Sequence, residues 1–354
     1  MDSGELVARA RVVALPMRER FRGIETREAL LIEGENAMWA EWSPFVEYDD
    51  AEAARWLGSA LAELGAPFDS DFDSLRSLNS RSGTGAPLPE RAQRVEGPAT
   101  IRVNATVPAV SPDAVPGVLA RFPGTRTAKV KVAERGQILA DDLARVRAVR
   151  DALGPDGRIR IDANAAWSLD EATTALEALA AFDLEYAEQP VASVADLGAL
   201  RRRLAGLVRI AADESIRKPA DPLEVVRAGA ADVVVLKAQP LGGAARALEI
   251  VQRARAEADV AFVTSSALET SVGLASAARF ARAVDMAFSS DLDHGLGTAA
   301  LLAADVTTEP LLPVDGLIPL RRVVPDPELL ERYAAAPERT AFWLERLRRA
   351  LRLA

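Results

Sequence analysis

Apolar and polar positions follow two different patterns along the chain, and the change between them divides it into two parts. Residues 1–97 mix short apolar runs with one stretch of helical spacing, which predicts an α+β unit ending near Gly97 and Pro98. The elements expected there are two strands, the loop between them, a helix and a second loop: Val7–Leu15, Glu28–Ile32, Arg18–Thr26, Ala51–Leu64 and Arg76–Pro89.

Residues 98–320 alternate short apolar strands with helical stretches rich in Ala, Leu and Arg. Eight such units fit an eight-stranded parallel barrel. A doubly wound open sheet is the alternative, but it usually has a Gly-rich turn after its first strand, and Asn104–Pro108 contains no glycine. The expected strands begin near Ile101, Lys129, Ile159, Tyr186, Arg209, Asp232, Val260 and Asp285.

The last segment, 321–354, is charged and helical over Pro327–Tyr333 and Glu338–Leu353. It does not continue the barrel pattern. We expect it to pack outside the barrel, against the N-terminal unit.

Composition narrows the possible chemistry. The net charge of -9 argues against a nucleic-acid partner, and no apolar run is long enough for a membrane span. With Asp2 and Glu5 in place of an apolar leader, we expect a cytoplasmic protein. Cysteine is absent and His294 is the single histidine, so any metal should be a hard cation held by oxygen atoms. No heptad pattern is evident, which favours a monomer.

Lysine is rare in this chain. Of 43 cationic residues, four are lysine: Lys129, Lys131, Lys218 and Lys237. Lysine can lose its proton when it is desolvated, whereas arginine does not, so the retained lysines are candidates for proton chemistry. Lys218, in a loop beside Pro219, is the exception and is expected to be a surface residue.

Two of these lysines share one strand. Lys129 and Lys131 are two residues apart and therefore point to the same face. Inside a barrel each ammonium would lower the pKa of the other, and one could act as a base. An amphipathic edge strand is the alternative. A third lysine, Lys237, ends the apolar run Val233–Leu236 on the strand expected across the barrel.

Three consecutive strands between these lysines end in carboxylates: Asp162, Glu188 and Asp213. One such acid alone is often a helix cap or a solvated loop residue. Three of them at the mouth of one barrel would repel each other, and a divalent cation such as Mg²⁺ would relieve that repulsion. The last two strands lead to Ser265 and Ser266, and to a segment containing Asp291, Asp293, His294, Gly295 and Gly297.

A metal flanked by lysines suits removal of a proton α to a carboxylate, the arrangement known from enolase-type sites. The strand ends resemble the muconate-lactonising subgroup of the enolase superfamily, and within it the o-succinylbenzoate synthases of the actinobacterial type. The closer resemblance is carried by Phe21–Gly23, Trp39–Phe45, Glu47–Tyr48, Val103–Pro108, Gly295–Thr298, Leu301–Asp305 and Pro313–Leu317.

This resemblance implies a (β/α)7β modified TIM barrel over residues 98–320, with an α+β capping domain of residues 1–97 completed by 321–354. It implies Mg²⁺, or Mn²⁺, on the three carboxylates. Lys131 would be the base and acid, Lys237 would stabilise the enediolate, and Lys129 would tune Lys131. A small carboxylate substrate is implied, in syn dehydration to 2-succinylbenzoate for menaquinone synthesis. The expected substrate-binding residues are Asn164, Ser265, Ser266, Gly295, Arg22 and Phe21.

Two other functions stay open at this stage. An N-acylamino-acid racemase or a dipeptide epimerase would use Lys131 and Lys237 as two bases, and Asp291 with Asp293 resembles the acidic pair with which such epimerases hold an ammonium group. The plainer interpretation is that these two acids face solvent or cap a helix. A barrel without catalysis is the other alternative.

Overall fold

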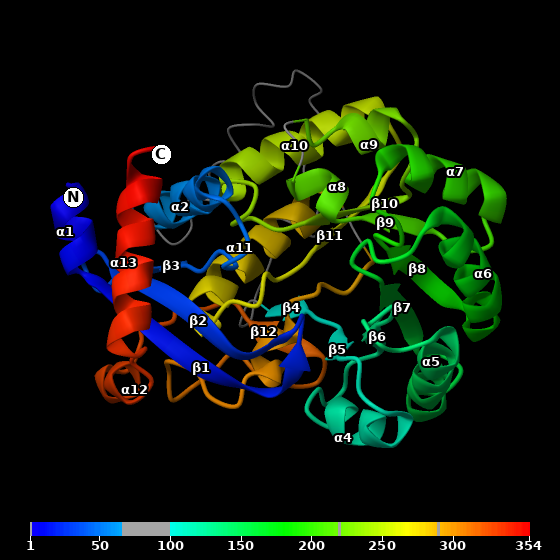
Figure 1. Cartoon of the computed structure of the whole chain (residues 1–354), viewed down its shortest axis with the longest axis horizontal. Helices are drawn as coiled ribbons and strands as arrows, with labels where there is room; N and C mark the ends of the chain where they lie inside the picture. Colours follow the sequence, from blue (N-terminus) through cyan, green and yellow to red (C-terminus); the bar gives the residue numbers. More distant parts are fainter. Residues whose placement is uncertain (1, 66–99, 219–220, 289–290) are drawn as a thin grey trace.

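The computed structural model describes residues 2–65, 100–218, 221–288 and 291–354, and it contains a capping unit beside a barrel (Figure 1). The capping unit is built on the antiparallel sheet β1-β2-β3. Its N-terminal elements are α1 (Ser3–Ala8), β1 (Ala10–Phe21), β2 (Ile24–Glu33), β3 (Trp39–Trp42) and α2 (Asp50–Gly65). The expected loop Arg76–Pro89 and the boundary at Gly97 lie outside the described residues.

The hairpin of β1 and β2 differs from the sequence interpretation. Asp2 caps a helix over Ser3–Ala8, where a strand was expected to begin at Val7. The expected loop Arg18–Thr26 is mostly strand, and only Arg22 and Gly23 form the turn, both with positive φ. Charged residues mislead here because this part of the hairpin projects beyond the sheet, so its side chains alternate between exposed and half-buried positions.

The C-terminal helices α12 (Pro327–Arg332) and α13 (Pro337–Leu351) return to this unit, as Figure 1 shows for α13 beside β1 and β2. Arg339 donates to Glu28 on β2, with its Nε at 2.7 Å. Trp343 packs edge-on against Trp42, with ring centroids 5.7 Å apart. The end of the chain therefore packs on the N-terminal sheet and lies outside the barrel.

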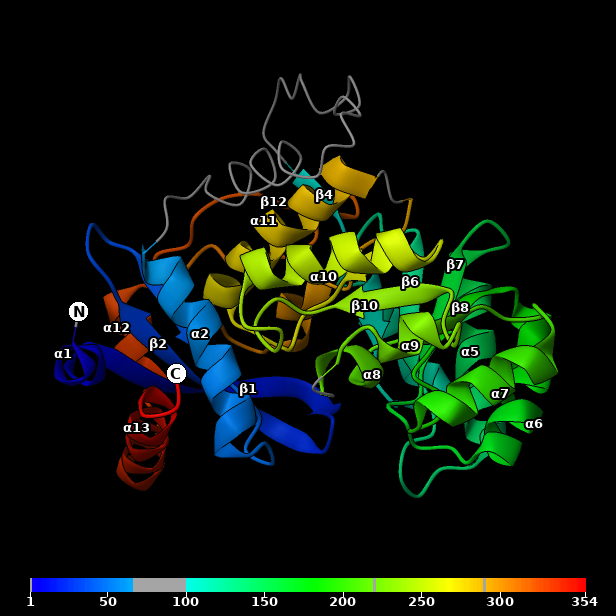
Figure 2. The same cartoon turned by 90° about the horizontal axis from the view of Figure 1, so that it is seen from above.

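The barrel is a parallel sheet in the order β11-β10-β9-β8-β7-β6-β5. Helices cover its outer face (Figures 1 and 2). The strands are β5 (Ala105–Val107), β6 (Thr127–Lys131), β7 (Arg158–Asp162), β8 (Leu184–Glu188), β9 (Ile210–Ala212), β10 (Val233–Leu236) and β11 (Ala261–Thr264). The helices are α4 (Val115–Leu119), α5 (Leu139–Leu153), α6 (Leu169–Leu179), α7 (Val194–Leu204), α8 (Glu214–Arg217), α9 (Glu224–Arg227), α10 (Ala244–Glu257) and α11 (Ser271–Phe288).

A short segment closes this sheet into a barrel. His294 pairs with Val103 and Gly295 pairs with Ser265, both in parallel, so residues 294 and 295 connect β11 to the start of the first strand. The ring of His294 fixes the segment: its Nδ1 accepts the Thr264 N–H at 2.9 Å, and its Nε2 lies 3.0 Å from Asp285. The modified TIM barrel expected from the sequence is confirmed.

Two predicted barrel strands are wrong in detail. Residues 100–102 form β4, which pairs antiparallel with β12 (Leu317–Pro319) outside the barrel. Asp285, where a strand was expected to begin, lies inside α11, a helix that is buried along most of its length. No helix among the described residues is long and apolar enough to cross a membrane.

Candidate active site

Lys129 and Lys131 point into the barrel from β6, while Val130 between them packs under the outer helices. The Lys129 ammonium donates to both oxygens of Glu188 at 3.0 Å and lies 3.3 Å from Asp162 Oδ2. Lys131 donates to Asp162 Oδ2 at 2.5 Å and to the side-chain oxygen of Asn164. The two lysines thus share Asp162, while Glu188 contacts only Lys129 and Asn164 contacts only Lys131.

These partners shift the two amines in opposite directions. Burial and the neighbouring Lys129 hold the pKa of Lys131 below its usual value, which agrees with the expectation for a base. Burial also opposes the charge on Lys129, but Glu188 and Asp162 outweigh it and raise the pKa of Lys129. Only Lys131 of the pair therefore has a lowered pKa overall, because two carboxylates face Lys129 and outweigh the effects that lower its pKa.

Asp162, Glu188 and Asp213 end or directly follow three neighbouring strands, β7, β8 and β9, and all are at most 2% exposed. Burial, Asp162 and Asp213 raise the pKa of Glu188 to about 7. Burial alone would raise the pKa of Asp162 and of Asp213, but nearby lysines lower both. The acids therefore lie close enough to influence one another electrostatically.

Among the residues that the structure describes, no three His, Cys, Asp or Glu side chains have the spacing of a metal site. Lysine ammonium groups contact each of the three carboxylates instead, with Lys237 donating to Asp213 Oδ2 at 2.5 Å. In donor chemistry the three acids fit a hard divalent cation, because they are buried oxygen donors whose mutual repulsion is visible at Glu188.

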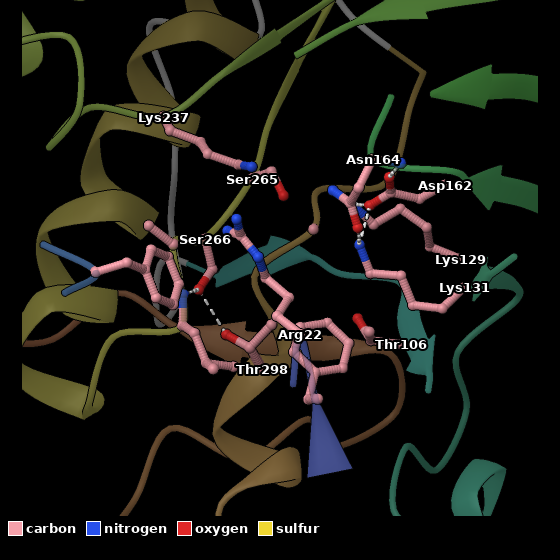
Figure 3. Close-up of a pocket in the computed structure, with 15 residues that line it drawn as sticks. Arg22, Thr106, Lys129, Lys131, Asp162, Asn164, Lys237, Ser265, Ser266 and Thr298 are labelled. Atoms are coloured by element: carbon pink, nitrogen blue, oxygen red, sulfur yellow. Dashed lines mark hydrogen bonds and ion pairs between the residues drawn. The ribbon is translucent and has the colours of Figure 1, made fainter. Parts of the chain in front are cut away.

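The pocket at the barrel mouth is lined by the two lysines from opposite sides, as Figure 3 shows for Lys131 and Lys237. Its free space is about 30 Å³, which holds no more than a water or two. The Arg22 side chain extends into it from the hairpin turn (Figure 3). Arg22 therefore occupies part of the space at the barrel mouth.

Side chains of the capping unit form one wall of this pocket. The Phe21 ring lies 5.3 Å from the Lys131 ammonium. Arg22 stacks on Phe45 at 4.3 Å and lies 3.8 Å from Glu47. Phe21, Arg22 and Phe45 thus line the pocket that contains the lysines.

The barrel supplies the remaining residues predicted to bind substrate. Asn164, Ser265, Ser266 and Gly295 all line the pocket. The Ser266 hydroxyl donates to Glu269 at 2.6 Å and accepts from Thr298 at 2.7 Å. Four further residues that the sequence pattern does not predict line the pocket: Thr106, Ala267, Leu268 and Thr298. Thr106 could have been found, since it lies at the end of the first barrel strand.

Asp291 and Asp293 lie at the other end of the barrel, where the strands begin. Asp293 is 2% exposed and accepts from Thr127, the first residue of β6, at 2.7 Å. Asp291 pairs with Arg158, the first residue of β7, at 2.6 Å. Neither acid lines the pocket with the lysines. The plainer interpretation holds for Asp291, whose side chain is 77% exposed to solvent, but it is wrong for Asp293, which is buried and pairs with Arg126.

Comparisons with known proteins agree with this geometry. Residues 119–326 match a family described as enolase C-terminal domain-like, and residues 12–63 match one described as enolase N-terminal domain-like. The chain is 50% identical over 347 residues to an o-succinylbenzoate synthase of Mycobacterium marinum, covering 97% of this chain and 94% of the relative. A relative of the same name from Mycolicibacterium smegmatis is 49% identical over 346 residues, covering 97% and 95%.

The chain belongs to the o-succinylbenzoate synthase family of the enolase superfamily. Solved structures of other superfamily members share its fold. A muconate lactonizing enzyme from Pseudomonas fluorescens has a TM-score of 0.69 at 21% identity, covering 92% of this chain and 98% of that one. An L-Ala-D/L-Glu epimerase from Bacillus subtilis has a TM-score of 0.66 at 22% identity, covering 89% and 96%.

Proposed function

We propose that this protein dehydrates 2-succinyl-6-hydroxy-2,4-cyclohexadiene-1-carboxylate to 2-succinylbenzoate, in menaquinone synthesis. The observation that carries the proposal is the pair Lys131 and Lys237 on opposite sides of one pocket, in a chain half identical to o-succinylbenzoate synthases. We further propose that the enzyme works in the cytoplasm and, because its sequence shows no heptad pattern, that it is a monomer.

In this mechanism Lys131 removes the proton α to the ring carboxylate. Its lowered pKa makes the neutral amine accessible, and its contact with Asn164 orients it. The same ammonium then returns the proton to the hydroxyl leaving from the same face, so that one C–H and one C–O bond break and water departs. Lys237 lies on the far side and stabilises the negative charge that develops on the substrate. Lys129 holds Glu188 and keeps a positive charge beside Lys131.

A divalent cation, Mg²⁺ or alternatively Mn²⁺, held by Asp162, Glu188 and Asp213, would offset charge on the substrate carboxylate. Its binding would require the ammonium groups of Lys129, Lys131 and Lys237 to release carboxylate oxygens that they contact in this structure. Arg22 is then the cation best placed to receive the second carboxylate of the substrate, since it extends into the pocket between the lysines (Figure 3).

The proposal is tested by mixing the enzyme, Mg²⁺ and the cyclohexadiene substrate and following the absorbance of the aromatic product. Rapid aromatisation supports it. A lack of turnover, together with α-deuterium exchange of an N-acylamino acid, would instead indicate a racemase that uses both lysines. The placement of Asp291 and Asp293 at the far end of the barrel removes the feature that resembled an epimerase.

A further inference from the structure

Arg217 connects the capping unit to the carboxylates of the barrel. It ends α8, four residues after Asp213, and its side chain is 4% exposed. Its Nε donates to Asp213 Oδ1 at 3.1 Å, its Nη1 to the Tyr48 hydroxyl at 2.8 Å and its Nη2 to Glu214 Oε1 at 2.7 Å. Each nitrogen of the guanidinium group thus holds a different residue.

Tyr48 is fixed from the side of the capping unit. Its ring packs against Phe45 and Trp56, with centroids 5.7 Å and 6.0 Å away. Its carbonyl accepts from Arg346 on α13 at 2.6 Å. The packing of the capping unit therefore holds the Tyr48 hydroxyl in place, and the hydrogen bond to this hydroxyl in turn fixes the Arg217 side chain.

The bond from Arg217 also orients Asp213. With Oδ1 held by Arg217, the other oxygen, Oδ2, is left to contact Lys237 on the pocket side. A planar guanidinium with several donors in fixed directions restricts the rotation of a carboxylate more than a single ammonium does. Losing either bond would let Asp213 rotate.

A second branch leads from Arg217 to the base. Glu214 Oε1, which accepts from Arg217, also accepts from the Asn164 side-chain amide at 3.4 Å. The oxygen of that same amide accepts from Lys131. Hydrogen bonds thus run without interruption from Tyr48 through Arg217 to Asp213 on one side and to Lys131 on the other.

We propose that Arg217 is a positioning residue through which Tyr48 of the capping unit sets the affinity of the Asp213 carboxylate site for a divalent cation. This inference rests on the metal site of the proposed function. If Arg217 only neutralised Asp213 and Glu214, any cation at this position would serve, and a residue of the capping unit would not influence the metal.

The test measures Mg²⁺ binding to the full-length, metal-stripped protein by isothermal titration calorimetry, without substrate. Tyr48→Phe removes one hydroxyl and should weaken Mg²⁺ binding about threefold to tenfold. Arg217→Lys keeps the charge but not the three-way contact, and should weaken binding about 10- to 100-fold. Adding Tyr48→Phe to Arg217→Lys should then have no further effect, because the connection is already broken.

Tyr333→Phe is the matched control, because Tyr333 lies on the far side of the capping sheet, after α12, and should leave Mg²⁺ affinity unchanged. Circular dichroism confirms folding, and Tyr48→Phe alone suffices if Arg217→Lys does not fold. A parent protein that binds no Mg²⁺ would overturn the metal site and this proposal together. Parent binding with an unchanged affinity in Tyr48→Phe, or additive losses in the double variant, would overturn this proposal alone.

Discussion

Glu41 is a buried carboxyl whose titration should make the free energy of unfolding fall as pH rises. It lies on β3, is 3% exposed and accepts hydrogen bonds from Ser43, Thr270 and the Gly273 N–H. Burial, with the charge of Glu269 next, raises its pKa to about 7 from the 4.5 of an ordinary glutamate, although Arg27 is nearby. The folded protein therefore holds a proton at Glu41 that the unfolded chain releases.

The sign and size of the effect follow from linkage. Between pH 4.5 and 7 the folded state binds more protons than the unfolded state, so stability is greatest below the unfolded pKa and is lost as pH rises through the folded pKa. The full difference corresponds to about 3.4 kcal/mol, of which about 2.5 kcal/mol falls between roughly pH 5 and pH 8.

Glu41→Gln imitates the neutral acid and removes this titration. We expect the stability of the parent protein, relative to the variant, to drop by about 2.5 kcal/mol over that pH range. Urea unfolding followed by tryptophan fluorescence measures it, because Trp39, Trp42, Trp56 and Trp343 all lie in the capping unit. Taking the difference between the two proteins cancels the titration of groups that they share.

Glu28 on β2 supplies a control of opposite sign. Burial alone would raise its pKa, but hydrogen bonds from Arg339 and Trp343 lower it. Relative to Glu28→Gln, the parent should therefore be stabilised above the unfolded pKa and lose that advantage as pH falls. A parent–Glu41→Gln difference that is flat with pH, or that grows with pH as the Glu28 difference does, would refute the reasoning.

Three further predictions concern the pocket and the far end of the barrel. Lys131→Ala and Lys131→Arg should each lower kcat for aromatisation at least about 1,000-fold, because alanine has no amine and arginine, which stays charged, cannot accept a proton. Full activity in either variant would show that Lys131 is not the base. Chelation by EDTA should abolish turnover and added Mg²⁺ should restore it; activity indifferent to EDTA would contradict the three-carboxylate site. Asp293→Asn should cost about 1–3 kcal/mol of stability through its contacts with Arg126 and Thr127 while leaving kcat within about twofold, measured by thermal unfolding and steady-state kinetics.

The strand ends were predictable from sequence because a parallel barrel brings the ends of its strands to one face. The approximate strand positions were enough to place Lys131, Asp162 and Lys237 at this face. Small errors in the predicted bounds of β6 or β10 did not change that placement. The segment 291–295 was harder to predict, because Asp293 and Gly295 are two residues apart yet lie toward opposite ends of the barrel. So short a segment has no alternation of apolar and polar residues that would indicate which of its side chains face the pocket.

The capping residues that line the pocket were predicted from the family resemblance more than from the spacing of apolar positions. That spacing predicted the bounds of α2 closely, yet it assigned the tip of the β1–β2 hairpin to a loop. Arg27 illustrates what no pattern reveals: it is buried and donates to the carbonyls of Ser43 and Leu268, which joins the capping sheet to a pocket wall. A contact to a backbone atom 241 residues away leaves no mark on local composition.

Because α13 packs on the sheet of the capping unit, this unit cannot reach its final packing until residues 337–351 have been synthesised. Arg339 and Trp343 can contact Glu28 only after the whole barrel between them has been translated. The barrel, whose strands follow one another in order, can assemble on the ribosome beforehand. The lysines and carboxylates of the barrel would therefore be in place before the capping unit is fully packed over them. Deleting α13 should destabilise the N-terminal sheet before it affects the barrel.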